Sequence, residues 1–242
     1  MNLIIDIGNN SAKFFLFNGP QMILHTRREK NYRDLLQEWS KQYGIERAIV
    51  STVIDLTEEQ KREIEEIGCP IVWFSNQTPM PIGIKYSTPH TLGCDRLAAA
   101  IGAADKAPAR NLLVIDAGSA ITIDFVDKEG NFRCGNISPG IKMRLKALHK
   151  FTARLPLVNK EGDTPALGYD TETAIRSGVI RGICHEIDGY INEIRENYGD
   201  VFVFLTGGDE KTLIYNIKNR IFADKFLVAK GLNKILSYYD IK

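Results

Sequence analysis

The sequence has almost no excess of charge of either sign. Its 242 residues carry 31 lysine and arginine side chains against 30 aspartate and glutamate side chains, a formal net charge of +1. Proteins that bind nucleic acid usually carry a clear basic excess, so the composition argues against a nucleic-acid partner. The hydrophobic fraction of 44% and the charged fraction of 25% are ordinary for a globular chain. They exclude a disordered, collagen-like or coiled-coil protein.

Long apolar runs and metal-binding patterns are also missing. No stretch approaches the roughly 18 apolar residues of a membrane-spanning helix, and residues 1–17 lack the basic region and long apolar core of a signal peptide. The four cysteines form no C-x-x-C pair, and neither they nor the four histidines have zinc-site spacing. Two disulfides are possible, but without an export signal we expect reduced thiols. We therefore expect a cytoplasmic protein without a membrane partner.

The first half of the chain alternates short apolar runs with turn residues. Leu3-Ile4-Ile5 is a β-rich run followed by a turn over residues 6–10, and residues 13–17 form a second run. Two such runs joined by a Gly/Asn turn are typical of a β-hairpin. Further strands are expected over residues 21–26, 48–53 and 70–74, and helices over residues 31–43 and 57–67.

The second half repeats this pattern. Residues 111–115 form an apolar strand, Asp116 opens a glycine turn like the one at Asp6, and residues 121–126 form the partner strand. A long helix with isoleucines at helical spacing, a strand over 200–205 and a closing helix over 229–239 follow. Duplicated halves explain the repeat. The sequence predicts an α/β fold with mixed sheets, in which an N-terminal lobe (1–110) and a C-terminal lobe (111–242) share one cleft.

Three glycine turns could contact a phosphorylated ligand. In the first, Gly8 lets the backbone approach a ligand, Asp6 can hold Mg²⁺, and Lys13 can offset phosphate charge. A hairpin turn with a solvated aspartate would explain this turn alone, but its second copy at Asp116 favours a two-lobed phosphate site. Residues 206–209 form the third turn, which could receive a flat nucleotide or could simply join a strand to a helix. The sequence has neither a Walker A loop nor a G-x-G-x-x-G fingerprint.

The order of these turns resembles the phosphate 1, phosphate 2 and adenosine motifs of the acetate and sugar kinase/heat-shock chaperone/actin superfamily. Within it, Tyr86 followed by Gly93-Cys94-Asp95-Arg96 resembles the tyrosine and G-x-D-R signature of type III pantothenate kinases. The run DIGNNSAK, which begins at Asp6, is similar to the family motif D-x-G-N-T-x-x-K. The run DAGSA, which begins at Asp116, is similar to D-x-G-T-A, and the runs SPGI, TARLP and TETAIRSG also match. Asn10 and Ser119 each replace a family threonine.

The resemblance implies two duplicated ribonuclease H-like (actin-like) lobes with mixed sheets and flanking helices. It implies ATP-dependent phosphorylation of pantothenate to 4'-phosphopantothenate, the first step of coenzyme A biosynthesis, in a homodimer that uses Mg²⁺ and a monovalent cation, K⁺ or NH₄⁺. Asp95 would be the general base, Asp6 would bind Mg²⁺ and phosphate, and Asp116 would bind the monovalent cation. The nucleotide-binding residues would be Asp6, Ile7, Gly8, Asn9, Asn10, Ser11, Ala12, Lys13 and Ser119. The pantothenate-binding residues would be Tyr86, Gly93, Cys94, Asp95, Arg96 and Thr173.

Other interpretations stay open at this stage. Asp95 could serve only as the N-cap of a helix that begins at Arg96. Proteins that this sequence resembles have been described as accessory factors for transcription, a role that needs no catalysis. Another small-molecule kinase or a polyphosphate phosphatase could also use the same fold, although the substrate residues Tyr86 and Thr173 argue against this.

Overall fold

The structure is a computed structural model that describes residues 1–9, 11–29 and 31–239. It divides into two compact units. The first contains residues 1–106 and the segment that begins at Leu227, and the second contains residues 107–226. The structure differs here from the predicted division at residue 110, because the closing helix belongs to the first unit. No helix in the described ranges is long and apolar enough to cross a membrane.

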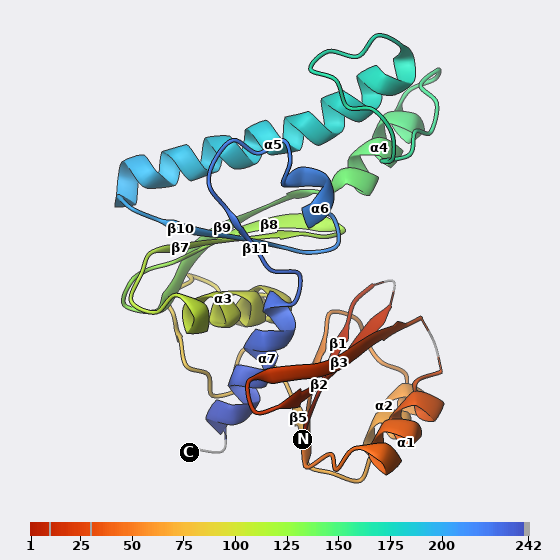
Figure 1. Ribbon diagram of the computed structural model, residues 1–242, viewed down its shortest axis with the longest axis vertical. Coiled ribbons are helices and arrows are strands. Elements are labelled where there is room, and N and C mark those ends of the chain that lie inside the picture. Colours follow the sequence, from red (N-terminus) through yellow and green to blue (C-terminus); the bar gives the residue numbers. More distant parts are fainter. Residues whose placement is uncertain (10, 30, 240–242) are drawn as a thin grey trace. The chain divides into compact units, whose positions relative to one another are not determined.

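A five-stranded mixed sheet forms the centre of the first unit, with the strand order β3-β2-β1-β4-β5 (Figure 1). The first three strands are antiparallel neighbours, whereas β4 and β5 run parallel to β1. The hairpin expected at the start of the chain is therefore present as β1 and β2. The strands are β1 (Asn2–Ile7), β2 (Ala12–Asn18), β3 (Gln21–Arg28), β4 (Arg47–Thr52) and β5 (Ile71–Trp73).

Helices cover both faces of this sheet. Alternate β1 residues such as Ile5 share a hydrophobic core with Trp39 of α1 (Tyr32–Gln42) and Ile64 of α2 (Glu58–Glu65). On the other face, Asn2 Nδ2 donates to Asn233 Oδ1 of α7 (Leu227–Tyr239) at 2.7 Å. Asp6 lies on the same side of β1 as Asn2, because side chains alternate along a strand. It therefore points to the face covered by α7 and α3 (Cys94–Lys106).

Close backbone packing of α7 on α3 explains why the closing helix belongs to the first unit. A Cβ atom on Gly231 would collide with the carbonyl oxygen of Ala98, and one on Gly102 would collide with that of Leu227. This contact depends on glycines in two helices far apart in sequence, so hydrophobic periodicity alone gives the helix but not its position. The unit also contains the short strand β6 (Gly83–Ile84) and the 3₁₀ helix η1 (Pro89–Thr91).

The second unit repeats the topology of the first. Read from β9, its strands follow in the order β9-β8-β7-β10-β11, which matches that of the first sheet: three antiparallel neighbours are followed by two parallel strands. Asp6 and Asp116 are each the next-to-last residue of the first strand of their unit. The duplicated α/β fold with mixed sheets is thus confirmed. The strands are β7 (Leu112–Ala117), β8 (Ala120–Val126), β9 (Asn131–Pro139), β10 (Phe202–Thr206) and β11 (Phe222–Ala223).

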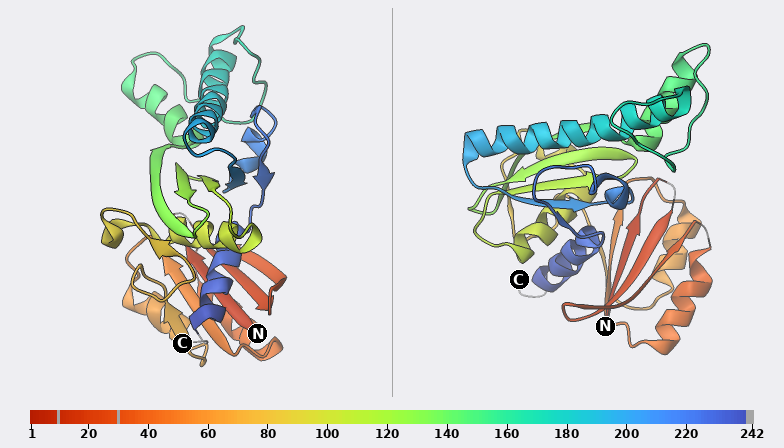
Figure 2. Two further views of the ribbon diagram at one scale, coloured as in Figure 1. Left: turned by 90° about the vertical axis from the view of Figure 1, so that its left-hand side faces the viewer. Right: turned by 45° about the horizontal axis from the view of Figure 1, so that its top comes forward.

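One long helix dominates the second unit. The predicted isoleucine stripe belongs to α5 (Thr171–Tyr198), which runs along one face of the sheet (Figure 2). Ile183 and Ile187 are fully buried in the same core as Ile115 of β7. The unit also contains α4 (Ile141–Phe151) and the short helix α6 (Glu210–Leu213).

Candidate active site

The turn between β1 and β2 places an acid beside a base. Asp6 and Lys13 pair in the antiparallel register, and Lys13 Nζ donates to Asp6 Oδ2 at 3.3 Å. Burial raises the pKa of the Asp6 carboxyl above its usual range, Lys13 opposes this rise, and the nearby charge of Asp95 adds to it. The turn is closed by Gly8, whose N–H donates to Ser11 O at 3.0 Å. A buried carboxylate beside an ammonium group and a glycine turn suits phosphate chemistry.

Two predicted nucleotide residues of this turn can contribute only through their backbone. The side chains of Ile7 and Ala12 are 1% and 0% exposed and pack in the hydrophobic core against α1. Asn9 is exposed, and Ser11 Oγ accepts a hydrogen bond from Arg27 Nε at 2.7 Å. Asn10 lies outside the described residues, so its predicted role in nucleotide binding stays a prediction.

The start of α3 carries the candidate base. Because α3 begins at Cys94, Asp95 lies within its first turn and not at the capping position. Asp95 Oδ1 accepts from the backbone N–H of Arg96 at 2.8 Å and lies against Gly93, where a Cβ atom would approach it to 2.6 Å. The Asp95 carboxylate is therefore held by its own loop, at the positive end of a helix dipole.

The remaining signature residues of the first unit lie around Asp95. Arg96 is buried, at 7% exposure, and its guanidinium lies 5.8 Å from the ring centroid of Tyr86, within the range of a cation–π contact. Cys94 points elsewhere: its Sγ donates to Phe74 O at 3.6 Å. Burial raises the pKa of that thiol. The first unit thus brings the predicted phosphate turn and the G-x-D-R loop onto one face of its sheet.

Two glycine turns of the second unit lie beside Asp116, and a third packs against one of them. A Cβ atom on Gly207, whose φ is +98°, would lie 2.5 Å from Asp116 Oδ1, and one on Gly140 would lie 2.6 Å from Ser119 O. Gly118 N donates to Ala120 O at 3.0 Å, as Gly8 does to Ser11 in the first unit. The phosphate 2 and adenosine turns predicted from sequence are therefore neighbours. Gly140, which was not predicted as a site residue, also belongs to this group.

A salt bridge that the sequence did not predict flanks these turns. Lys160 Nζ lies 2.5 Å from Asp209 Oδ1, and the backbone N–H of Asp209 donates to Ala117 O at 3.0 Å. The bridge links the segment before α5 to the third glycine turn. No short-range motif marks Lys160, because its partner is 49 residues away in sequence.

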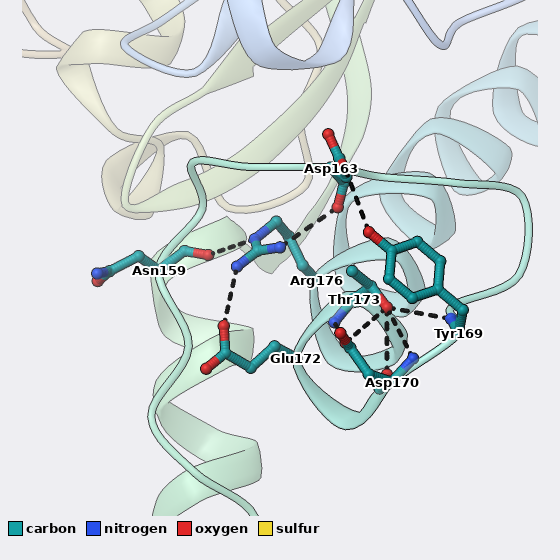
Figure 3. Close-up of polar contacts among 7 residues, drawn as sticks. All are labelled: Asn159, Asp163, Tyr169, Asp170, Glu172, Thr173 and Arg176. Atoms are coloured by element: carbon teal, nitrogen blue, oxygen red, sulfur yellow. Dashed lines mark hydrogen bonds and ion pairs between the residues drawn. The ribbon is translucent and has the colours of Figure 1, made fainter.

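Thr173 is part of the capping box at the start of the helix on which it lies, with Asp170 as the N-cap. The Asp170 side chain accepts from the backbone N–H of Thr173, and Thr173 Oγ1 accepts from the backbone N–H of Asp170 at 3.1 Å, which makes a capping box (Figure 3). Nearby, Arg176 Nε donates to Asn159 O at 2.9 Å and its guanidinium pairs with Glu172. These contacts order the start of α5, and the predicted substrate role of Thr173 stays a prediction.

The carboxylates on these turns suit a metal that is shared with a phosphorylated ligand. Within the described ranges, no group of three or more histidine, cysteine, aspartate or glutamate side chains is placed to hold a metal ion. Mg²⁺ in nucleotide enzymes is usually held by one or two carboxylates together with substrate phosphates. Asp6 fits this arrangement. Asp116, whose Oδ1 lies beside Gly118 and Gly207, offers a carboxylate oxygen of the kind that hard cations prefer.

Solved structures with the same fold support the duplicated architecture. A conserved protein from Campylobacter jejuni, named for the Baf family of transcriptional activators, aligns with a TM-score of 0.66 and 23% identity over 99% of this chain and 100% of its own. The activator of 2-hydroxyisocaproyl-CoA dehydratase from Clostridium difficile, solved with bound ADPNP, aligns with a TM-score of 0.53 and 12% identity over 99% and 94% of the two chains. At these identities the likeness shows the fold alone.

Sequence comparison is more specific. The profile of the type III pantothenate kinase family matches residues 2–193. A type III pantothenate kinase from Bacteroides fragilis is 50% identical over 238 residues, which cover 98% of each chain. The one from Phocaeicola vulgatus is 47% identical over 240 residues, which cover 99% of each chain. This chain belongs to the type III pantothenate kinase family.

Proposed function

We propose that this protein transfers the γ-phosphoryl group of ATP to the primary hydroxyl of pantothenate, giving 4'-phosphopantothenate for coenzyme A synthesis. Family membership supports the activity. The observation that carries the site assignment is the placement of Asp95, in the first turn of α3, on the sheet face that also carries Asp6. Phosphoryl transfer depends mostly on positioning and charge stabilisation, and both are properties of these fixed loops.

In this proposal each residue of the first unit has one task. Asp95 orients the pantothenate hydroxyl and accepts its proton during transfer. Arg96, buried beside Tyr86, makes paired hydrogen bonds to the carboxylate or amide of the substrate. Lys13 moves from Asp6 to the incoming phosphate, and Asp6 holds Mg²⁺, which neutralises phosphate charge when bound.

A coupled assay that reports ADP release tests this function. Pantothenate should give steady turnover, whereas a panel of other hydroxylated small molecules should not. Turnover with a different alcohol would indicate another small-molecule kinase, and silence with every substrate would favour the accessory factor for transcription. The Campylobacter jejuni structure does not strengthen that alternative, because 23% identity carries the fold and no function.

The monovalent cation of the family is assigned to Asp116. We expect Asp116→Ala to abolish activation by K⁺ or NH₄⁺ and to lower turnover in K⁺ buffer to the level of the unmodified protein in Na⁺ buffer, because the alanine removes the only charged ligand assigned to that cation. Turnover at equal ionic strength in the chloride salts of K⁺, NH₄⁺ and Na⁺ measures the effect. Asp200→Ala, at an exposed position of the same unit, serves as the control. Equal activity of unmodified protein in Na⁺ and K⁺ would contradict the assignment.

We also assign the homodimer interface. An apolar groove with a volume of about 830 Å³ lies between α4 and α5, and Thr171 and Ala174 at its edge flank Thr173. Large exposed apolar patches mark interaction sites, and the resemblance implies a pantothenate site completed by the partner subunit. A second copy of this chain is therefore the proposed occupant. The main apolar residues that line the groove are Ala147, Leu148, Phe151, Leu155, Ile175 and Val179.

Disrupting this groove should separate the subunits. Phe151 is 79% exposed in the single chain and would be buried in the proposed dimer. Phe151→Glu would bury an unpaired charge at that position. The substitution should therefore shift the mass found by sedimentation from dimer to monomer. Tyr215→Glu is the control, because Tyr215 is 88% exposed and does not line the groove. A dimer that survives Phe151→Glu would place the interface elsewhere.

A cytoplasmic location, without nucleic-acid or membrane partners, completes the proposal.

A further inference from the structure

Ser51 of β4 has a hydroxyl group that the fold leaves without a hydrogen bond. The residue is 0% exposed, and its Oγ finds no partner among the described residues. A buried polar group in this condition costs about 1–3 kcal/mol, so its presence needs an explanation. In the part of the chain that the structure describes, the other buried side-chain atoms without partners are Ser40 Oγ, Ser177 Oγ and Glu210 Oε2.

The sheet register places Ser51 beside the candidate phosphate site. In the parallel pairing of β1 with β4, Ser51 is directly opposite Asp6. Neighbouring strands lie about 4.7–4.9 Å apart, and paired residues point to the same face. Ala48 and Val50 of β4 fill the core on the opposite face, against α1 and α2. The Ser51 hydroxyl therefore lies on the Asp6 face.

The start of α3 lies over the same part of the sheet. The backbone N–H of Phe74 donates to Val50 O at 2.8 Å, and Phe74 O accepts the contact from Cys94 Sγ. The first turn of α3, which carries Asp95, is thereby anchored to the chain just beyond β5. Ser51 lies on β4, which separates β5 from the strand of Asp6. Its hydroxyl is therefore buried on the sheet face that carries Asp6, next to the strand that anchors the start of α3.

We propose that Ser51 is a positioning residue, whose hydroxyl donates a hydrogen bond to the Asp6 carboxylate when a nucleotide occupies the phosphate turn. Without nucleotide, Asp6 Oδ2 accepts from Lys13, whose side chain is 53% exposed and free to follow an incoming phosphate. Once Lys13 pairs with phosphate, the Asp6 carboxylate loses its hydrogen bond from Lys13. Ser51, directly opposite Asp6 on the neighbouring strand, is the buried donor that can replace it. The inference rests on the proposed nucleotide site and does not depend on the identity of the phosphoryl acceptor.

Nucleotide binding measured without pantothenate tests this role. By titration calorimetry, Ser51→Ala should weaken binding of ATP with Mg²⁺ about tenfold, the size expected for one hydrogen bond to a charged group. Its thermal midpoint should not fall, because the substitution removes a hydroxyl that has no partner in the unliganded fold. In steady state the KM for ATP should rise with little change in kcat. Ser51→Cys, which keeps a weak donor of similar size, should give a smaller loss.

Ser40→Ala is the matched control. Its hydroxyl is also buried without a partner, but it lies on α1, which packs on the opposite face of the sheet. It should leave nucleotide affinity unchanged. Affinity of Ser51→Ala within twofold of the unmodified protein would overturn the proposal, as would equal losses in Ser51→Ala and Ser40→Ala. If the unmodified protein binds ATP but does not phosphorylate pantothenate, the proposed function fails while the Ser51 test still gives its answer.

Discussion

Asp95→Asn is expected to lower the rate of pantothenate phosphorylation by about 10²–10⁴-fold, the usual contribution of a general base. Asparagine has the same shape as aspartate, and its Oδ1 can keep the 2.8 Å hydrogen bond from Arg96 N that holds the loop. It cannot accept the proton of the attacking hydroxyl. Turnover measured by ADP release should collapse, while the thermal midpoint and the affinity for ATP should change little.

A second carboxylate of the same helix provides the control. Asp105 is half-exposed and pairs with Lys234 at 2.7 Å, away from the start of α3. Asp105→Asn should leave turnover within about twofold of the unmodified protein, because surface ion pairs contribute little. Near-normal turnover of Asp95→Asn would show that another group accepts the proton, and it would withdraw the role assigned to Asp95.

Gly231→Ala is expected to destabilise the protein by about 3 kcal/mol, the upper part of the usual range for an overpacked contact. In an isolated helix, replacing glycine by alanine should stabilise the helix, because alanine is a better helix former than glycine. Here the new Cβ would collide with the backbone of Ala98, so α7 must move away from α3. The free energy of unfolding from urea denaturation measures the effect. Turnover should also fall, because α3 carries Asp95.

Gly189→Ala in α5 is the matched control for this prediction. No heavy atom lies within 4 Å of the position of its Cβ, and Gly189 is exposed. It should stabilise the protein by about 0.5–1 kcal/mol, the ordinary helix-propensity gain. If Gly231→Ala also stabilised the protein, the two helices would not be in the close contact described above.

Local signals in the sequence predicted much of the architecture. The two Asp-x-Gly turns gave the duplication, and the structure confirms it by matching strand orders in the two units. The isoleucine stripe gave α5, because a buried helix face repeats at helical spacing. Both features are encoded in short stretches of sequence, so no tertiary information was needed.

Features that depend on distant contacts were not predictable in the same way. The closing helix was expected from its periodicity, but its place against α3 depends on the fit of Gly231 to Ala98. The Lys160–Asp209 salt bridge and the packing of Gly140 on Ser119 likewise join distant segments. The motif match did not show which residues of the predicted nucleotide turn can contact a nucleotide with their side chains and which can do so only with their backbone. The burial of Ile7 settles this for its side chain.

The most direct test of the central claim is to follow where the phosphoryl group goes. The protein is incubated with ATP, Mg²⁺, K⁺ and pantothenate in water enriched in ¹⁸O, and the products are examined by mass spectrometry. A pantothenate kinase should yield one 4'-phosphopantothenate for each ADP, with no ¹⁸O in the ester because water takes no part in the transfer. Inorganic phosphate that carries ¹⁸O, without a phosphorylated pantothenate, would show hydrolysis and would contradict the account.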